Sequence, residues 1–171
     1  MNKTIALAAT LLSATGCSTT SPPLAVSDVT AKIRVLHGVG VTMYPGKTCY
    51  GRSAGGVSLA SGGFSFLVAN KKVGMPVTED TPWSYHEYVI PANEPLTLAM
   101  YLYSSTPGAV TVTQTCGPVG ATFTPEAGKH YDTNMLFQSG RCSVQVRELT
   151  ETSPGKATAQ IKPISPAYAC R

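Results

Sequence analysis

Short runs of alternating apolar and polar residues recur along the chain from residue 31 onward. Residues 96–103 (LTLAMYLY) are the clearest run, because leucine or methionine occupies every second position. Alternation with a period of two turns one face of a strand toward a core and the other toward solvent. Almost no window keeps a 3.6-residue apolar period long enough to predict a helix. The same alternation, or a β-rich run of similar length, covers residues 31–36, 56–59, 85–90, 109–116, 129–137, 142–149 and 157–164.

Turn-forming residues separate these runs and indicate the fold class. Glycine, proline, asparagine or serine marks residues 91–95, 106–108, 125–128, 139–140 and 153–155. About 7–9 short strands at this spacing predict an all-β fold, a single immunoglobulin-like or transthyretin-like β-sandwich. Pro163 cannot donate a backbone hydrogen bond, so the last run is expected at a sheet edge.

Residues 61–84 interrupt the regular pattern, with little alternation after Phe66. Long irregular segments in compact domains are often functional. The apolar members of this segment either fold inward, which leaves it inert, or serve as anchors for a partner. They are Phe64, Phe66, Met75 and Trp83.

A binding surface in this region would combine Trp83 and Tyr85 with the basic pair Lys71 and Lys72. Aromatic side chains at such junctions often dominate the energy of an interface. The alternative is that they close the open end of the sandwich as part of the core. The solvent faces of the strands are rich in threonine and serine and offer little to anchor a tight partner. We therefore expect binding at the segment and not at a sheet face.

Composition narrows the class of protein further. Only 13% of the residues are charged, the formal net charge is +4, and no basic run is longer than Lys71-Lys72. A nucleic-acid-binding surface needs clustered basic residues, so nucleic acid is not an expected partner.

The first residues are typical of an exported protein. Lys3 precedes the apolar run 5–12 (IALAATLL), which is too short to span a bilayer, and small residues follow. Ala14-Thr15-Gly16-Cys17 resembles the lipobox of bacterial lipoproteins, whose processing enzymes attach lipid to the cysteine and cleave before it. The alternative is ordinary secretion, with Cys17 present by chance.

The domain organisation follows from this resemblance. Residues 1–16 are expected to be the signal peptide, 17–27 a lipidated tether and 28–171 the sandwich domain. The tether (STTSPPLAVS after the cysteine) is polar and contains proline. Ser18 follows the cysteine, as in enterobacterial lipoproteins that are sorted to the outer membrane. The resemblance implies an anchor of palmitate-like acyl chains in the outer membrane, with the domain facing the periplasm.

Four cysteines remain after Cys17, and an even number in an exported chain predicts two disulfides with three connectivities. The preferred pairing joins Cys116 to Cys142, because one ends a predicted strand and the other begins one, with a single strand between them. This arrangement can bring the two ends together across adjacent strands. Cys49–Cys170 then follows by elimination. No pair has CxxC spacing, so zinc is not expected.

Catalytic motifs are weak. Gly51-Arg52-Ser53-Ala54-Gly55 fits the G-x-S-x-G pattern, but that nucleophile elbow requires a strand followed by a helix in an α/β sheet. The three histidines, His37, His86 and His130, are far apart in sequence without second ligands nearby. We therefore expect no enzyme, no metal and no cofactor.

Three stretches resemble an uncharacterised family of proteobacterial cell-envelope lipoproteins with small immunoglobulin-like β-sandwich domains. They are residues 73–76 (VGMP), 87–97 (EYVIPANEPLT) and 123–131 (FTPEAGKHY) leading to Cys142. The resemblance implies a fold and an envelope location, and it carries over no catalytic residue.

The function expected from the sequence is a lipid-anchored envelope binding or accessory module. Its partners would be the membrane, through the N-terminal lipid, and an envelope or effector protein. The alternatives are an inhibitor or immunity protein against an effector that attacks the wall or membrane, and a structural envelope component without a discrete ligand.

The lipobox generates a direct prediction. Cys17→Ala should release the protein from the membrane fraction or leave it uncleaved, because the thiol is the expected lipid acceptor. Intact mass spectrometry of the membrane-extracted wild type should show cleavage after Gly16 and added acyl chains. A processed Cys17→Ala protein that stays in the membrane would contradict the assignment.

Overall fold

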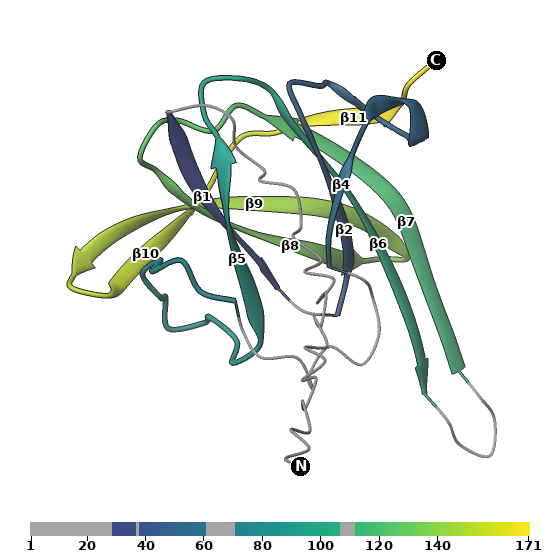
Figure 1. The fold of residues 1–171 in the computed structure, drawn as a ribbon. Helices are drawn as coiled ribbons and strands as arrows, with labels where there is room; N and C mark the ends of the chain where they lie inside the picture. The colour runs from purple at the N-terminus through teal and green to yellow at the C-terminus, as the bar shows by residue number, and fades with distance from the viewer. Residues whose placement is uncertain (1–28, 37, 61–70, 107–111) are drawn as a thin grey trace, which may run out of the picture.

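The fold is a sandwich of two β-sheets, seen in a computed structural model that describes residues 29–36, 38–60, 71–106 and 112–171 (Figure 1). One sheet has five strands and the other has six. In spatial order the five-stranded sheet consists of β10 (Lys156–Ile161), β9 (Arg141–Ser153), β8 (His130–Gln138), β1 (Thr30–Leu36) and β5 (Tyr85–Pro91).

The six-stranded sheet lies against the first. Its strands in spatial order are β3 (Cys49–Tyr50), β11 (Ser165–Ala169), β7 (Val112–Phe123), β6 (Leu96–Thr106), β2 (Gly40–Pro45) and β4 (Val57–Ala60). Neighbouring strands are antiparallel except for the pairs β1–β8 and β3–β11. A single 3₁₀ turn, η1 (Arg52–Ala54), connects β3 and β4 among the described residues.

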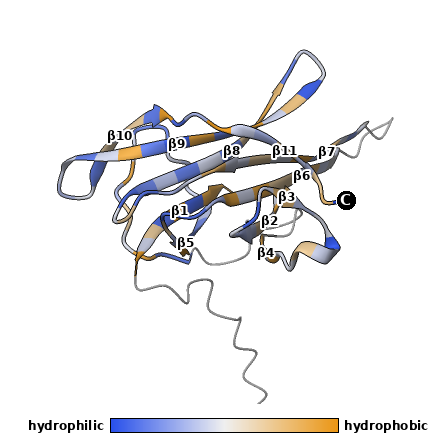
Figure 2. Ribbon diagram, turned by 90° about the horizontal axis from the view of Figure 1, so that it is seen from above, coloured by the Kyte–Doolittle hydropathy of each residue, from blue (hydrophilic) through white to orange (hydrophobic). Residues whose placement is uncertain are grey.

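One apolar core fills the space between the sheets. Ile33 and Val146 come from the five-stranded sheet, Met43, Leu98 and Met100 come from the other, and all five are 0% exposed. Strands that carry core residues, such as β9, show both hydrophobic and hydrophilic segments along their length in Figure 2. The period-two alternation is therefore what assembles the two layers.

The prediction of an all-β sandwich is confirmed, and the strand list needs three corrections. The described residues contain eleven strands, more than the expected 7–9, because 40–45, the two-residue β3 and 165–169 also pair. Residues 112–116 of the predicted run 109–116 belong to a strand that continues to Phe123, and residues 109–111 lie outside the described residues. The last predicted strand ends at Ile161, and the chain then crosses to the other sheet as β11. The immunoglobulin-like or transthyretin-like relationship stays a prediction.

Both predicted disulfides are present, and one of them has an unexpected role. Cys116 is on β7 and Cys142 on β9, so this bridge joins the two sheets, with the Cα atoms 6.2 Å apart. The expectation of adjacent strands was therefore wrong, although the pairing is right. Cys142 is the second residue of β9, whereas Cys116 lies within β7, and both pack against the core between the two sheets.

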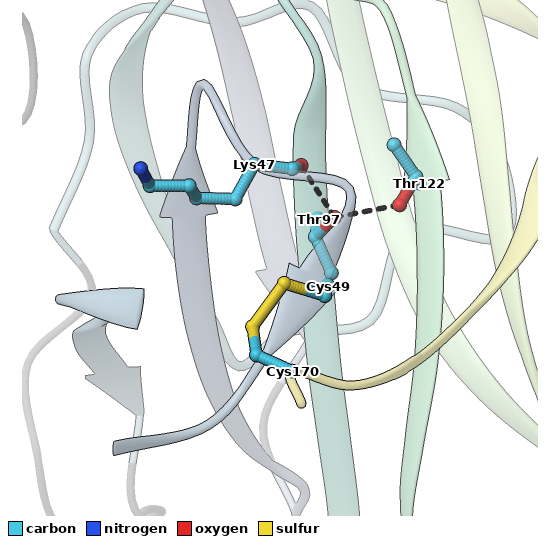
Figure 3. The surroundings of a disulfide bond; sticks show 5 residues. All are labelled: Lys47, Cys49, Thr97, Thr122 and Cys170. Carbon is cyan, nitrogen blue, oxygen red and sulfur yellow. Dashed lines mark hydrogen bonds between the residues drawn. A yellow bond between two sulfur atoms is a disulfide. The ribbon is translucent and has the colours of Figure 1, made fainter. Parts of the chain in front are cut away.

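The second disulfide closes the C-terminus onto the six-stranded sheet. Cys49 and Cys170 have Cα atoms 5.1 Å apart, and the Cys170 backbone N–H donates to the Tyr50 carbonyl at 2.9 Å. Figure 3 shows the bridge beside Thr97, whose hydroxyl donates to the Lys47 carbonyl at 2.6 Å. The turn before β3 is thus fixed both covalently and by a hydrogen bond.

The two bridges should differ in their effect on stability. They close loops with sequence separations of 26 residues (Cys116–Cys142) and 121 residues (Cys49–Cys170). Loop-closure entropy predicts losses of about 3.5 and about 5 kcal/mol when each is replaced by an alanine pair. Urea denaturation of the two double variants tests this, after peptide mapping without reductant has verified the pairing. A peptide that links Cys49 to Cys116 would refute the assignment.

Candidate functional site

Residues 71–84, called the strap below, cross the outer face of the five-stranded sheet. The strap begins at the edge of β5, where the Glu87 backbone N–H donates to the Lys71 carbonyl at 2.8 Å. It reaches the β9–β10 hairpin at Val77, which donates to Gly155 and accepts from Ala157 at 3.0 and 2.8 Å. In Figure 1 the strap is the loop between β5 and β10. An irregular segment is thus attached at two distant points of one sheet.

A buried ion pair lies beneath the strap. Arg34 on β1 and Glu87 on β5 face each other in the strand register and are 0% and 1% exposed. The Arg34 guanidinium donates to Glu87 Oε1 at 2.8 Å and to the Pro76 carbonyl at 2.8 Å. Glu87 Oε2 accepts the backbone N–H of Val73 at 2.7 Å. Each member of the pair therefore binds the strap as well as its partner.

The remaining polar groups of the pair are also occupied. The Met75 backbone N–H donates to Glu87 Oε2 at 3.3 Å, and the Arg34 guanidinium carbon lies 4.7 Å from the centre of the Tyr85 ring. Burial raises the pKa of Glu87, but hydrogen bonds from Arg34 and the two backbone N–H groups, with the Arg34 charge, outweigh it. The pKa of Glu87 consequently lies below its ordinary value. The carboxylate is charged at neutral pH despite its burial.

The charged row continues across the sheet. Asp132 on β8 is in register with Arg34, and Arg147 on β9 is in register with Asp132. Arg147 holds Asp132 with two hydrogen bonds of 2.8 Å, from Nε and one terminal nitrogen, and also bonds Asp80 of the strap. Hydrogen bonds from Arg147 and then Thr78 lower the pKa of Asp80. Charges of alternating sign therefore line the outer face of four strands, and the strap contacts both ends of the row.

A small apolar layer accompanies these charges. Met75 of the strap, Tyr85 of β5 and Leu149 of β9 are 7%, 7% and 4% exposed, yet none belongs to the main core cluster. The register puts Tyr85 and Leu149 on the outer face, on either side of the charged row. Met75 therefore folds inward, and Tyr85, expected on a binding surface, supports the strap from beneath.

Three of the four predicted binding residues are exposed on this strap. Trp83 is 75% exposed, and Lys71 and Lys72 are exposed as well. The Lys71 ammonium lies 5.0 Å from the centre of the Tyr88 ring and the Lys72 ammonium 5.8 Å from that of Tyr85, so aromatic faces help to fix both cations. Phe64 and Phe66 lie outside the described residues.

Two hollows flank the turn at residues 77–81. The smaller, of about 280 Å³, is lined by Trp83, Pro82, Tyr85, Lys72 and this turn. The larger, of about 690 Å³, opens between the turn and the β9–β10 hairpin and includes Arg147, Lys156 and Thr158. The exposed indole thus stands at the rim of a concave surface rather than on a flat one.

The described residues contain no group of three or more His, Cys, Asp or Glu side chains placed to hold a metal ion. The Gly51–Gly55 stretch forms η1 and its flanks at the surface, between two short strands. His86 Nδ1 accepts the Lys71 backbone N–H at 3.0 Å, a structural role at the start of the strap. The part of the chain that the structure describes contains no helix that is long and apolar enough to cross a membrane.

Sequence reasoning missed the Arg34–Glu87 pair. Both residues occupy polar positions of alternating strands, which the pattern assigns to solvent. The two residues become neighbours only when β1 pairs with β5, and no local pattern in the sequence indicates that register.

Comparison of the chain with protein-family models, with curated proteins and with solved structures found no match.

Replacing Glu87 by glutamine should reduce the free energy of unfolding by about 3–5 kcal/mol, because it leaves the Arg34 charge buried without a counter-ion. The side-chain NH₂ group of the glutamine, a hydrogen-bond donor, would also face either the Arg34 donors or the backbone N–H donors of the strap. The matched control is Asp80→Asn at the exposed end of the row, where the loss should stay within about 1 kcal/mol. Urea denaturation followed by circular dichroism measures both, and equal losses would contradict the assigned role of the buried pair.

The pH dependence supplies a second readout. A carboxylate with a lowered pKa stabilises the fold above its ordinary value of 4.5, and this contribution disappears as the pH falls through the lowered value. The stability difference between the wild type and Glu87→Gln should therefore be largest near neutral pH and narrow below pH 4.5. A difference that stays constant into strong acid would show that the Glu87 charge is not responsible.

Proposed function

We propose that this protein is a non-enzymatic binding or accessory module of the bacterial envelope. It is anchored by lipid on Cys17 in the outer membrane and faces the periplasm. The working surface is the outer side of the strap, with Trp83 as the central anchor, Lys72 beside it on the same hollow and Lys71 at the start of the strap next to Tyr88. The N-terminal resemblance supports the location, and the geometry of the strap supports the surface.

The observation that carries this proposal is the exposure of Trp83 on a segment whose backbone is hydrogen-bonded to the buried ion pair and to the β9–β10 hairpin. An indole that is 75% exposed leaves a large apolar surface in water. Tryptophan is among the residues that most often dominate binding energy, especially beside a concavity that a partner can fill. The ion pair beneath the strap fixes the backbone before binding, which reduces the entropy lost on association.

Charge indicates the kind of partner. No described carboxylate forms an ion pair with Lys71 or Lys72. A protein partner with an apolar pocket for the indole and acidic groups near its rim would complement this surface. Such charges raise the association rate and specificity more than the affinity.

Trp83→Ala should decrease recovery of the partner at least about tenfold, which corresponds to about 1.4 kcal/mol. The free energy of unfolding should change by no more than about 0.5 kcal/mol, as for other surface substitutions. Affinity capture from envelope extract with the lipidated protein, quantified by mass spectrometry, measures recovery, and urea denaturation measures stability.

Tyr168→Ala is the matched control, since Tyr168 is 74% exposed on β11 of the other sheet. It should retain both partner recovery and stability. Unchanged recovery with Trp83→Ala, or a loss of stability of about 3–5 kcal/mol typical of a core aromatic, would reject the strap surface. The identity of the captured protein would distinguish an accessory role from an inhibitor or immunity role.

A further inference from the structure

The outer face of the six-stranded sheet differs from that of the five-stranded sheet in having no charge. The positions of β6 that alternate with its core residues are Thr97, Ala99, Tyr101, Tyr103 and Ser105. On the same face β2 presents only glycine, threonine and tyrosine, and β7 presents threonine and glycine besides Pro118. Among the described strand residues of this face there is no Asp, Glu, Lys, Arg or His.

Tyrosine rings on this face lie over glycines of neighbouring strands. A Cβ atom added to Gly40 would be 2.1 Å from both Cε1 and Cζ of Tyr101, so the ring occupies the space above the Gly40 backbone. Gly120 has the same relationship to Tyr50, with 2.4 Å to Cε1. The Tyr50 hydroxyl donates to the Pro118 carbonyl at 3.3 Å. The glycines thus let the rings settle onto the sheet as an aromatic layer.

One end of this face is covered, and the other, called the open half below, is exposed. The turn before β3 covers one end, where Thr97 donates to the Lys47 carbonyl and the Cys49–Cys170 bridge closes the surface (Figure 3). At the other end Tyr101 and Tyr103 are 41% and 57% exposed. Here β6 and β7 project together beyond the rest of the sheet (Figure 1).

Hydroxyl groups surround the exposed rings. Thr115 is opposite Tyr103 in the register, and Thr113 is opposite Ser105 on the same face. Both threonines are exposed, and so is Pro118, which lies opposite Tyr101 where β7 carries an extra residue. The open half therefore combines two aromatic rings, a proline and several hydroxyls, and the described residues of its strands include no charged side chain.

We propose that this open half binds an uncharged polysaccharide, with pyranose rings stacked on Tyr101 and Tyr103. A pyranose presents an apolar C–H face that suits an aromatic ring, while its hydroxyls can exchange hydrogen bonds with Thr113 and Thr115. The absence of charge favours a neutral ligand, because no ion on the face must lose its hydration without a counter-ion. The sequence predicts few anchors for a partner on the threonine-rich faces, but the exposed rings of Tyr101 and Tyr103 provide two.

Two exposed rings on one strand favour a ligand that is longer than a monosaccharide. Tyr101 and Tyr103 are two residues apart on one strand, and side chains at such positions share a face. A β-linked chain lying along β6 would contact both rings and then Pro118 or the threonines of β7. This surface is on the opposite sheet from the strap, so the two proposals fail or succeed independently.

The test is calorimetric titration of the purified full chain with chitohexaose and cellohexaose, which are uncharged, and with hexagalacturonate, which carries a carboxylate on each ring. We expect binding of at least one neutral hexamer and markedly weaker binding of the charged one. Tyr103→Ala should weaken binding of the neutral hexamer about tenfold or more, equivalent to about 1.4 kcal/mol. Tyr103→Phe keeps the ring and should stay within about threefold of the wild type.

Trp83→Ala and Tyr168→Ala are the controls, because they remove exposed aromatics elsewhere and should bind like the wild type. Tyr103 is preferred to Tyr101 for truncation because its ring is more exposed, and thermal unfolding verifies that the variant is folded. The proposal is overturned if no neutral hexamer binds at up to about 5 mM, which corresponds to about 3 kcal/mol. It is also overturned if hexagalacturonate binds equally well, or if Tyr103→Ala leaves the affinity unchanged.

Discussion

The buried pair of Arg34 and Glu87 is the interaction on which the outer half of this molecule depends. Two charges taken out of water are tolerated only when their partners are complete, and here backbone groups of residues 73–76 complete them. The strap keeps water from the pair, and the pair positions the strap. Each supports the other, because the strap supplies hydrogen-bond partners that water would otherwise have to supply to both side chains.

This mutual dependence explains how an irregular segment can present a fixed surface. The strap makes a single one-residue bridge, between Val77 and Lys156, so repeated strand pairing does not hold it. The Asp80–Arg147 ion pair at one end of the charged row holds it instead, together with backbone hydrogen bonds to Glu87 and Arg34 at the other end and the inward Met75. A buried ionic network of this kind contributes less to net stability than an apolar layer of equal volume would, but it determines position through directed hydrogen bonds. These hydrogen bonds position the strap that carries Trp83.

The two sheets therefore expose surfaces of opposite character. The charged face of the five-stranded sheet is covered by the strap, which exposes the indole of Trp83 with Lys72 beside it. The uncharged face of the six-stranded sheet is half covered by a turn tied down through Cys49–Cys170, and it exposes tyrosine rings at the other half. The bridge between Cys116 and Cys142 joins the sheets, so both surfaces belong to one body.

The sequence by itself determined the class of fold and most strand positions, because period-two alternation is a local property. It also favoured the cysteine pairing that is present, but the Cys116–Cys142 bridge joins the two sheets and not adjacent strands as expected. It missed β2, whose run between Gly40 and Pro45 is short, and β11, where Pro166 masks the strand. The lipid anchor stays a prediction from the N-terminal residues. Only tertiary structure decided that Arg34 meets Glu87, 53 residues away, and that Tyr85 is buried while Trp83 is exposed. Alternation shows which side chains leave the core, but long-range pairing decides which of them an irregular segment then covers.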